Sequence, residues 1–262
     1  MHQKAVAPCT LGCLCLGLAL GQGAGGRDPG AVALLRKAAA AMGVEGRAIS
    51  RLSGQGIFTD LSGERPQVWE FAVLADGLDR VRWERSDGQR MLVTVVFGDF
   101  GWVWDGRSLG RLSLSRTAGR SVEALAVMAL NAWIEAPGRR AALLAPQESG
   151  GRMLDRVEVG RRLENESAPP GLARAVERSS RKELLLDPQE GLLERLRYFR
   201  HNGDWRDDLP VELAFADLRR IQGVLWPHLA TVEVDGRITG QYAFERVEFN
   251  ADIDPQVFEE PE

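Results

Sequence analysis

Hydrophobic and polar residues alternate over two long parts of the chain, residues 50–115 and 182–249. Turn-forming Gly and Asp residues interrupt the alternation at the spacing of about 8–12 residues that is typical of antiparallel sheets. This pattern favours a meander over β-α-β units. The predicted strands are Arg51–Thr59, Val68–Leu74, Arg80–Arg85, Arg90–Phe97, Gly101–Trp104, Arg111–Ser115, Lys182–Leu186, Leu193–Phe199, Val211–Leu218, His228–Val234 and Arg237–Phe249.

Helical periodicity marks two further segments. Residues 31–42 form an amphipathic pattern that ends at Gly43, a natural helix stop. Residues 122–134 form a strongly apolar helix, and Arg139–Leu144 is predicted as a short second helix after it. The rest of 145–181 has a weak pattern, with Val157 and Val159 in a candidate strand.

The last fifty residues carry the strongest local signals. Asp235-Gly236 lies between two β-rich runs, where a two-residue hairpin turn needs positive φ at both positions. The gap between the preceding strands is predicted to turn around Gly223 and Trp226-Pro227. Leu209–Phe258 therefore reads as an antiparallel meander with a pinned tail, Asn250–Phe258.

The amino terminus has the parts of an export signal. An apolar run from Leu11 to Leu20 follows Lys4 and ends in small residues, so residues 1–21 are predicted as a cleaved signal peptide and 22–30 as a glycine-rich spacer. The three cysteines all lie in this leader. Thr10–Cys13 fits a lipobox poorly, so a periplasmic protein without disulfides is favoured over a lipid-anchored form.

Composition narrows the function classes. The chain has 262 residues, of which 44% are hydrophobic, and a net charge of -4. A chain of this length supports one large domain with its own core. The charge argues against a nucleic-acid footprint.

Catalytic and metal motifs are sparse. Gly106–Gly110 matches the G-x-S-x-G nucleophile elbow around Ser108, but that motif needs a strand, a sharp turn and a helix, and β-like sequence surrounds it here. Two histidines and no cysteine remain after the leader, which gives no metal-ligand cluster. We therefore expect no catalytic residue, metal or cofactor, and keep a Ser108 hydrolase as the remote alternative.

Aromatic residues gather on the strands, often two positions apart. They either fill a closed core or line a cavity inside a curved sheet, which would bind acyl chains. The helix at 122–134 would cover that cavity through Leu125, Met128 and Trp133. Arg82 is the polar candidate at the rim of the cavity, although a cross-strand ion pair beside Glu84 is the favoured role for it. The predicted cavity residues are Trp69, Phe71, Val81, Trp83, Trp102, Trp104 and Phe199.

An ordered set of short patterns resembles the periplasmic outer-membrane lipoprotein-sorting (LolA/LolB-like) proteins. These patterns cover residues 31–118 and 182–261. They are Leu34-Leu35 with Ala38 and Ala41–Gly43, Val81–Glu84, Phe97–Asp105 with Trp102, Leu185–Pro188 with Gly191-Leu192, Ile221–Gly223 with Pro227, and Asn250–Phe258.

The resemblance implies an α+β fold, mainly β: a single curved antiparallel sheet that forms an incomplete β-barrel, with helices over a hydrophobic cavity. One domain is expected at 31–262, and the chain departs from the family at about 119–181, where it would carry an enlarged helical insertion. The implied function is non-enzymatic binding of lipid or lipoprotein acyl chains by a monomer, with an inner- or outer-membrane envelope protein as a further partner. An envelope interaction or sensor module on the same fold is the alternative.

Overall fold

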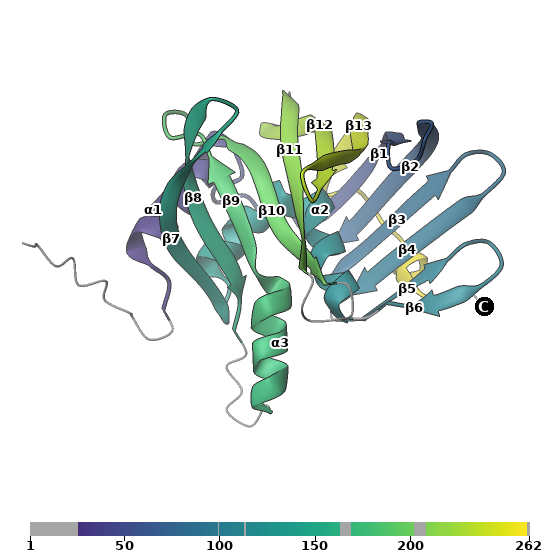
Figure 1. The fold of residues 1–262 in the computed structure, drawn as a ribbon, viewed down its shortest axis with the longest axis horizontal. Helices are drawn as coiled ribbons and strands as arrows, with labels where there is room; N and C mark the ends of the chain where they lie inside the picture. The colour runs from purple at the N-terminus through teal and green to yellow at the C-terminus, as the bar shows by residue number, and fades with distance from the viewer. Residues whose placement is uncertain (1–25, 99, 113, 163–168, 202–207, 261–262) are drawn as a thin grey trace, which may run out of the picture.

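The computed structural model describes residues 26–98, 100–112, 114–162, 169–201 and 208–260. The predicted signal peptide lies outside these ranges. Within them the strands form one antiparallel sheet of thirteen strands, in the order β6-β5-β4-β3-β2-β1-β13-β12-β11-β10-β9-β8-β7. The two β-rich halves of the sequence meet where β1 pairs with β13. The sheet does not close, because the described parts of β6 and β7 stay at its opposite ends (Figure 1).

The element bounds follow the predicted pattern closely in both β-rich halves. The strands are β1 Arg51–Asp60, β2 Gln67–Asp76, β3 Arg80–Ser86, β4 Met91–Phe97, β5 Phe100–Trp104, β6 Leu109–Arg111, β7 Arg139–Ser149, β8 Arg152–Arg161, β9 Lys182–Leu186, β10 Leu193–His201, β11 Asp208–Ile221, β12 Val224–Val234 and β13 Arg237–Phe249. The helices are α1 Pro29–Ala41, α2 Leu114–Glu135, α3 Pro170–Ser180 and the short 3-10 helix η1 Pro255–Phe258. The expected mainly-β, single-sheet fold is confirmed.

Local sequence explains where α1 begins and ends. The Asp28 side chain accepts hydrogen bonds from the N–H groups of Gly30 and Ala31 at 2.7 and 3.1 Å, which caps the helix. After the helix, Gly43 adopts φ 73°. A Cβ at Gly43 would lie 2.3 Å from the carbonyl oxygen of Gly223, so this position requires glycine.

Helices α1 and α2 share a hydrophobic core with one face of the sheet, which we call the inner face. Leu35 and Leu130 are fully buried in this core, as are the inner-face residues Leu52 and Leu213. One polar contact also anchors α2: Asn131 Nδ2 donates to the Val44 carbonyl at 2.7 Å.

A second, smaller core covers the outer face of β4 and β5. The segment after β13 crosses this face and buries Ala251, Ile253 and Phe258 against Val95 and Trp102. Asp254 caps η1 by accepting from the Gln256 N–H at 3.0 Å. The predicted pinned tail is therefore held by its own hydrophobic contacts with the outer face of the sheet.

Replacing Phe258 with alanine should lower the free energy of unfolding by about 3 kcal/mol, because it empties the centre of this second core. Phe258 is 5% exposed. Urea denaturation monitored by circular dichroism measures the change, with the exposed Gln256→Ala as control. Equal stability of the two variants would contradict a structural role for the tail.

Three local predictions are wrong. Arg139–Leu144 belongs to strand β7 and not to a helix, and residues 145–161 complete a β7–β8 hairpin that extends the sheet. The predicted strand at 111–115 ends at Arg111, since α2 begins at Leu114. Trp226-Pro227 lies within β12, and the turn before it is at Gln222-Gly223.

Candidate functional site

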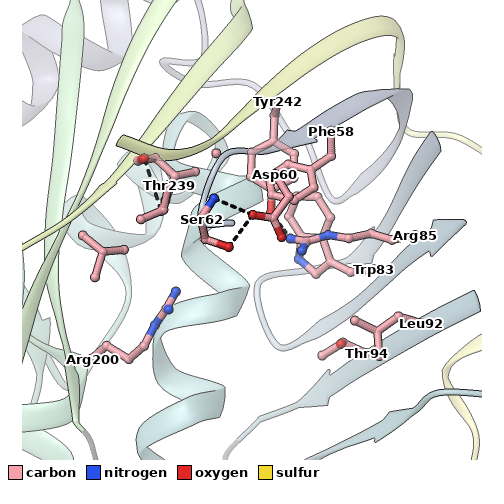
Figure 2. A pocket seen from close by; sticks show the side chains of 13 residues that line it. Phe58, Asp60, Ser62, Trp83, Arg85, Leu92, Thr94, Arg200, Thr239 and Tyr242 are labelled. Atoms are coloured by element: carbon pink, nitrogen blue, oxygen red, sulfur yellow. Dashed lines mark hydrogen bonds between the residues drawn. The ribbon is translucent and has the colours of Figure 1, made fainter. Parts of the chain in front are cut away.

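A pocket of about 290 Å³ opens on the inner face of the sheet. It lies near the ends of β1, β3 and β12 and near the starts of β4 and β13, so residues far apart in the sequence meet there. Arg200, near the end of β10, lies across the pocket from the aromatic residues (Figure 2).

Aromatic rings form one wall of the pocket. The centroids of Phe58 and Tyr242 lie 4.5 Å apart, and those of Trp83 and Tyr242 lie 5.4 Å apart. Phe71 extends the cluster behind them and packs edge-on against Tyr242 at 5.3 Å. Rings at these separations stabilise one another, so the wall is a packed apolar surface.

A cation lies against this wall. The guanidinium carbon of Arg85 is 4.0 Å from the centroid of the Phe58 ring, and an Arg85 N–H donates to the Tyr242 hydroxyl oxygen. Guanidinium groups stack favourably on aromatic faces, which holds this one in place.

Asp60 brings the opposite charge to the rim. Its carboxylate accepts from the backbone N–H of Ser62 at 2.9 Å and from the Ser62 hydroxyl at 2.6 Å, as Figure 2 shows. The pocket is therefore amphipathic, with a ring-lined wall and charged groups around it.

No protein-family profile and no curated protein sequence matches this chain. Solved structures do match. A LolA superfamily protein from Nitrosomonas europaea superposes with a TM-score of 0.58 at 13% identity, over 88% of this chain and 97% of that one. A domain assigned to outer membrane lipoprotein sorting, from Vibrio parahaemolyticus, superposes with a TM-score of 0.56 at 10% identity, over 87% of this chain and 96% of that one. The chain has the fold of the LolA superfamily.

The fold resemblance inferred from the sequence is thus confirmed. In this LolA-like open barrel, Phe71, Val81 and Trp83 are buried on the inner face as expected. Trp83 lines the pocket, whereas Phe71 and Val81 pack within the core. Trp69 lies at the edge of the same core, with the Arg90 guanidinium 4.7 Å from its ring centroid.

Three predicted cavity residues are on the wrong face. Trp102 and Trp104 pair with Val95 and Val93 and pack in the second core under the tail. Phe199 follows Tyr198, which lies in the inner core, so Phe199 points to the outer face. A shift of one residue along a strand moves every side chain to the opposite face of the sheet. The prediction placed these three residues on the inner face, and the structure places them on the outer face.

The predicted position of Arg82 at the cavity rim is also wrong. Arg82 lies on the outer face, where it donates to Glu84 at 2.5 Å and to the Val257 carbonyl at 2.6 Å. The arginine stacked on the aromatic wall of the pocket is Arg85, which was not among the predicted residues. The alternation of faces along β3 could have identified Arg85, because Arg85 lies two residues after Trp83 and four after Val81 and so shares their inner face.

The three residues proposed for the lid, Leu125, Met128 and Trp133, are all buried on the inner face. They pack directly into the core and leave little space beneath α2. The gap between Ala126, Val127 and Trp226 has a volume of only about 10 Å³. The open pocket therefore lies beside the region that α2 fills.

Ser108 does not occupy a nucleophile elbow. It lies in the turn between β5 and β6, and its hydroxyl donates to Asp105 at 3.2 Å. The backbone N–H groups of Ser108 and then Arg107 hydrogen-bond the Asp105 carboxylate and lower its pKa, which makes it a poor base. The strand-turn-helix geometry that the motif requires is missing at this turn.

Among the described residues, no cluster of three or more His, Cys, Asp or Glu side chains is arranged to hold a metal ion. Within the same ranges, every helix is too short or too polar to cross a membrane.

Proposed function

We propose that this chain is a non-enzymatic periplasmic carrier that binds lipid or lipoprotein acyl chains. The observation that carries the proposal is the pocket walled by Phe58, Trp83 and Tyr242 on the inner face. Its supporting context is the open-barrel fold shared with a lipoprotein-sorting domain. The predicted signal peptide would bring the protein to the periplasm.

The pocket is sized for part of an acyl chain. Its volume of about 290 Å³ is near the lower end of ligand sites, which run from roughly 300 to 1,000 Å³. Burial of about six methylene groups would contribute roughly 5 kcal/mol at ~0.8 kcal/mol each. A longer chain would need α2 to move away from the inner face, which makes α2 the movable cover in this proposal.

The second candidate is an envelope interaction or sensor module. The close packing of Leu125, Leu130 and Trp133 beneath α2 favours it, because a filled barrel leaves less room for cargo. The two functions differ in one measurable property, which is stoichiometric lipid binding.

We expect organic extraction of the purified protein, followed by mass spectrometry, to release a stoichiometric lipid. A neutral monoacylglycerol with a fluorescent acyl chain should also bind, and Trp83→Ala should weaken its affinity about tenfold through lost ring contact. The matched control is Trp104→Ala, which removes the same side chain from the outer face. Protein that carries no lipid and binds no acyl probe would refute the carrier function and favour the interaction module.

A further inference from the structure

Arg85 is in an unusual position for a charged residue. It is partly buried on the inner face of β3, two residues after Trp83, which is 6% exposed. Its neighbours there are the rings of Phe58 and Tyr242. A cation held against apolar rings needs a strong hydrogen-bond or charge partner.

Among the described residues, Arg85 has one hydrogen-bond acceptor and no charge partner. A guanidinium has five N–H donors, and among the described residues this one donates to the neutral hydroxyl oxygen of Tyr242. Within the described ranges, no Asp or Glu oxygen lies within 4.0 Å of the Arg85 nitrogens. Arg82 and Arg90, by contrast, pair with Glu84 and Asp87 at 2.5 Å each.

Two arginines and one carboxylate line the pocket. Its charged lining residues are Arg85, Arg200 and Asp60. The Asp60 oxygen Oδ1 already accepts two hydrogen bonds from Ser62. The indole Nε1–H of Trp83 is buried with no acceptor among the described residues. Trp83 and Arg85 therefore place more N–H donors at the aromatic wall than the described residues offer them acceptors.

We infer that the ligand is an anionic amphiphile, whose carboxylate or phosphate oxygens accept hydrogen bonds from Arg85 while its apolar chain packs against Phe58, Trp83 and Tyr242. The inference rests on the proposed lipid-binding function and names the chemical class of the ligand. A guanidinium binds planar carboxylates and phosphates through two parallel hydrogen bonds, and the ring stack holds Arg85 ready for this geometry. The oxyanion could belong to a fatty acid or to a phospholipid headgroup.

Three ligands with the same chain isolate the contribution of charge: dodecanoate, dodecyl phosphate and uncharged dodecanol, titrated at pH 8 below micelle-forming concentrations. The two anions should bind the wild-type protein about tenfold or more tightly than dodecanol. Arg85→Met should remove this preference, so that the anions bind no more tightly than dodecanol. Arg246→Met is the control, because Arg246 is an exposed arginine on β13 that pairs only with Glu248 among the described residues and should keep the full preference.

Arg85→Lys and added salt keep the inference testable if Arg85→Met does not fold. Lysine retains the charge but not the paired donors, so we expect an intermediate preference. Salt should weaken binding of the anions and not of dodecanol. Lysophosphatidylglycerol and dodecanoate, compared on the wild-type protein, distinguish a phospholipid from a fatty acid as the source of the oxyanion.

Equal affinity for dodecanol and the anions, unaffected by Arg85→Met, would overturn the anionic-ligand inference and leave lipid binding intact. Failure of all three ligands and of the neutral monoacylglycerol probe would instead overturn the carrier function itself.

Discussion

Replacing Trp226 with alanine is expected to lower the free energy of unfolding by about 4 kcal/mol. Trp226 is 2% exposed and is among the largest fully buried side chains. Its ring meets Phe244 at 6.1 Å and Phe249 at 5.5 Å, both edge-on, and the residue also borders α2 at Ala126 and Val127. The substitution leaves a cavity where β12, β13 and α2 meet. Urea denaturation followed by circular dichroism gives the loss.

The control is Trp226→Phe, which keeps an aromatic ring and removes an indole N–H that has no acceptor among the described residues. This variant should lose less than half as much stability as Trp226→Ala, since an unpaired buried donor is itself unfavourable. A loss as large for phenylalanine as for alanine would mean that ring packing is not what stabilises this junction.

Local turn chemistry explains why much of the sheet could be predicted. Asp235 and Gly236 have φ of 49° and 74°, as a two-residue hairpin turn requires. The same reasoning could have found the missed β7–β8 hairpin, because Gly150 and Gly151 also have positive φ. The mistaken helix at 139–144 came from an apolar run without clear alternation. Pro146 in β7 is compatible with a strand at the sheet edge.

The face of each strand was predictable where one side stays polar. Phe71, Val81 and Trp83 were assigned correctly, because charged residues alternate with them. In β4 and β5 the alternation is lost, since the tail covers their outer face and Val93, Val95 and Val96 are all buried. That contact joins residues more than a hundred positions apart, and no local pattern reports it.

The predicted face of Phe199 was wrong for a different reason. Tyr198 and Phe199 are adjacent aromatics, so ring content alone cannot decide which one faces inward. The arginines decide it: Arg195 and Arg197 both pair with Glu212 on the outer face, and Tyr198 alternates with them. The same parity argument places Arg200 with Tyr198 on the inner face, beside the pocket.

The outer face of β7 to β11 carries a continuous ladder of ion pairs. It runs from Arg140 and Arg181 through Glu158, Glu183 and Arg156 to Arg197, Glu212 and Arg195. Glu158 and Glu183 are each only 5% exposed. The carboxylates alternate with arginines, so each buried anion is held by cations from neighbouring strands. Networks of this kind stabilise more than isolated surface pairs do.

Glu183 is the centre of this ladder, and Glu183→Ala should lower the free energy of unfolding by about 3 kcal/mol. Its carboxylate lies 3.1 Å from Arg156, 3.4 Å from Arg181 and 3.5 Å from Arg197. Removing it leaves these arginines without their shared anion beside β9, whose residues are all buried. Urea denaturation at low and high salt measures the loss, which should persist in salt because the carboxylate is buried.

The control is Glu248→Ala, which breaks an exposed pair with Arg246 and should change stability by less than about 1 kcal/mol. Glu183→Gln separates charge from shape, because the amide fills the same space without the anion. We expect most of the alanine loss in this variant as well, since an amide oxygen cannot balance three cations. If Glu183→Gln were as stable as the wild type, the ladder would act through packing alone, and charge would not be what holds β8, β9 and β10 in register.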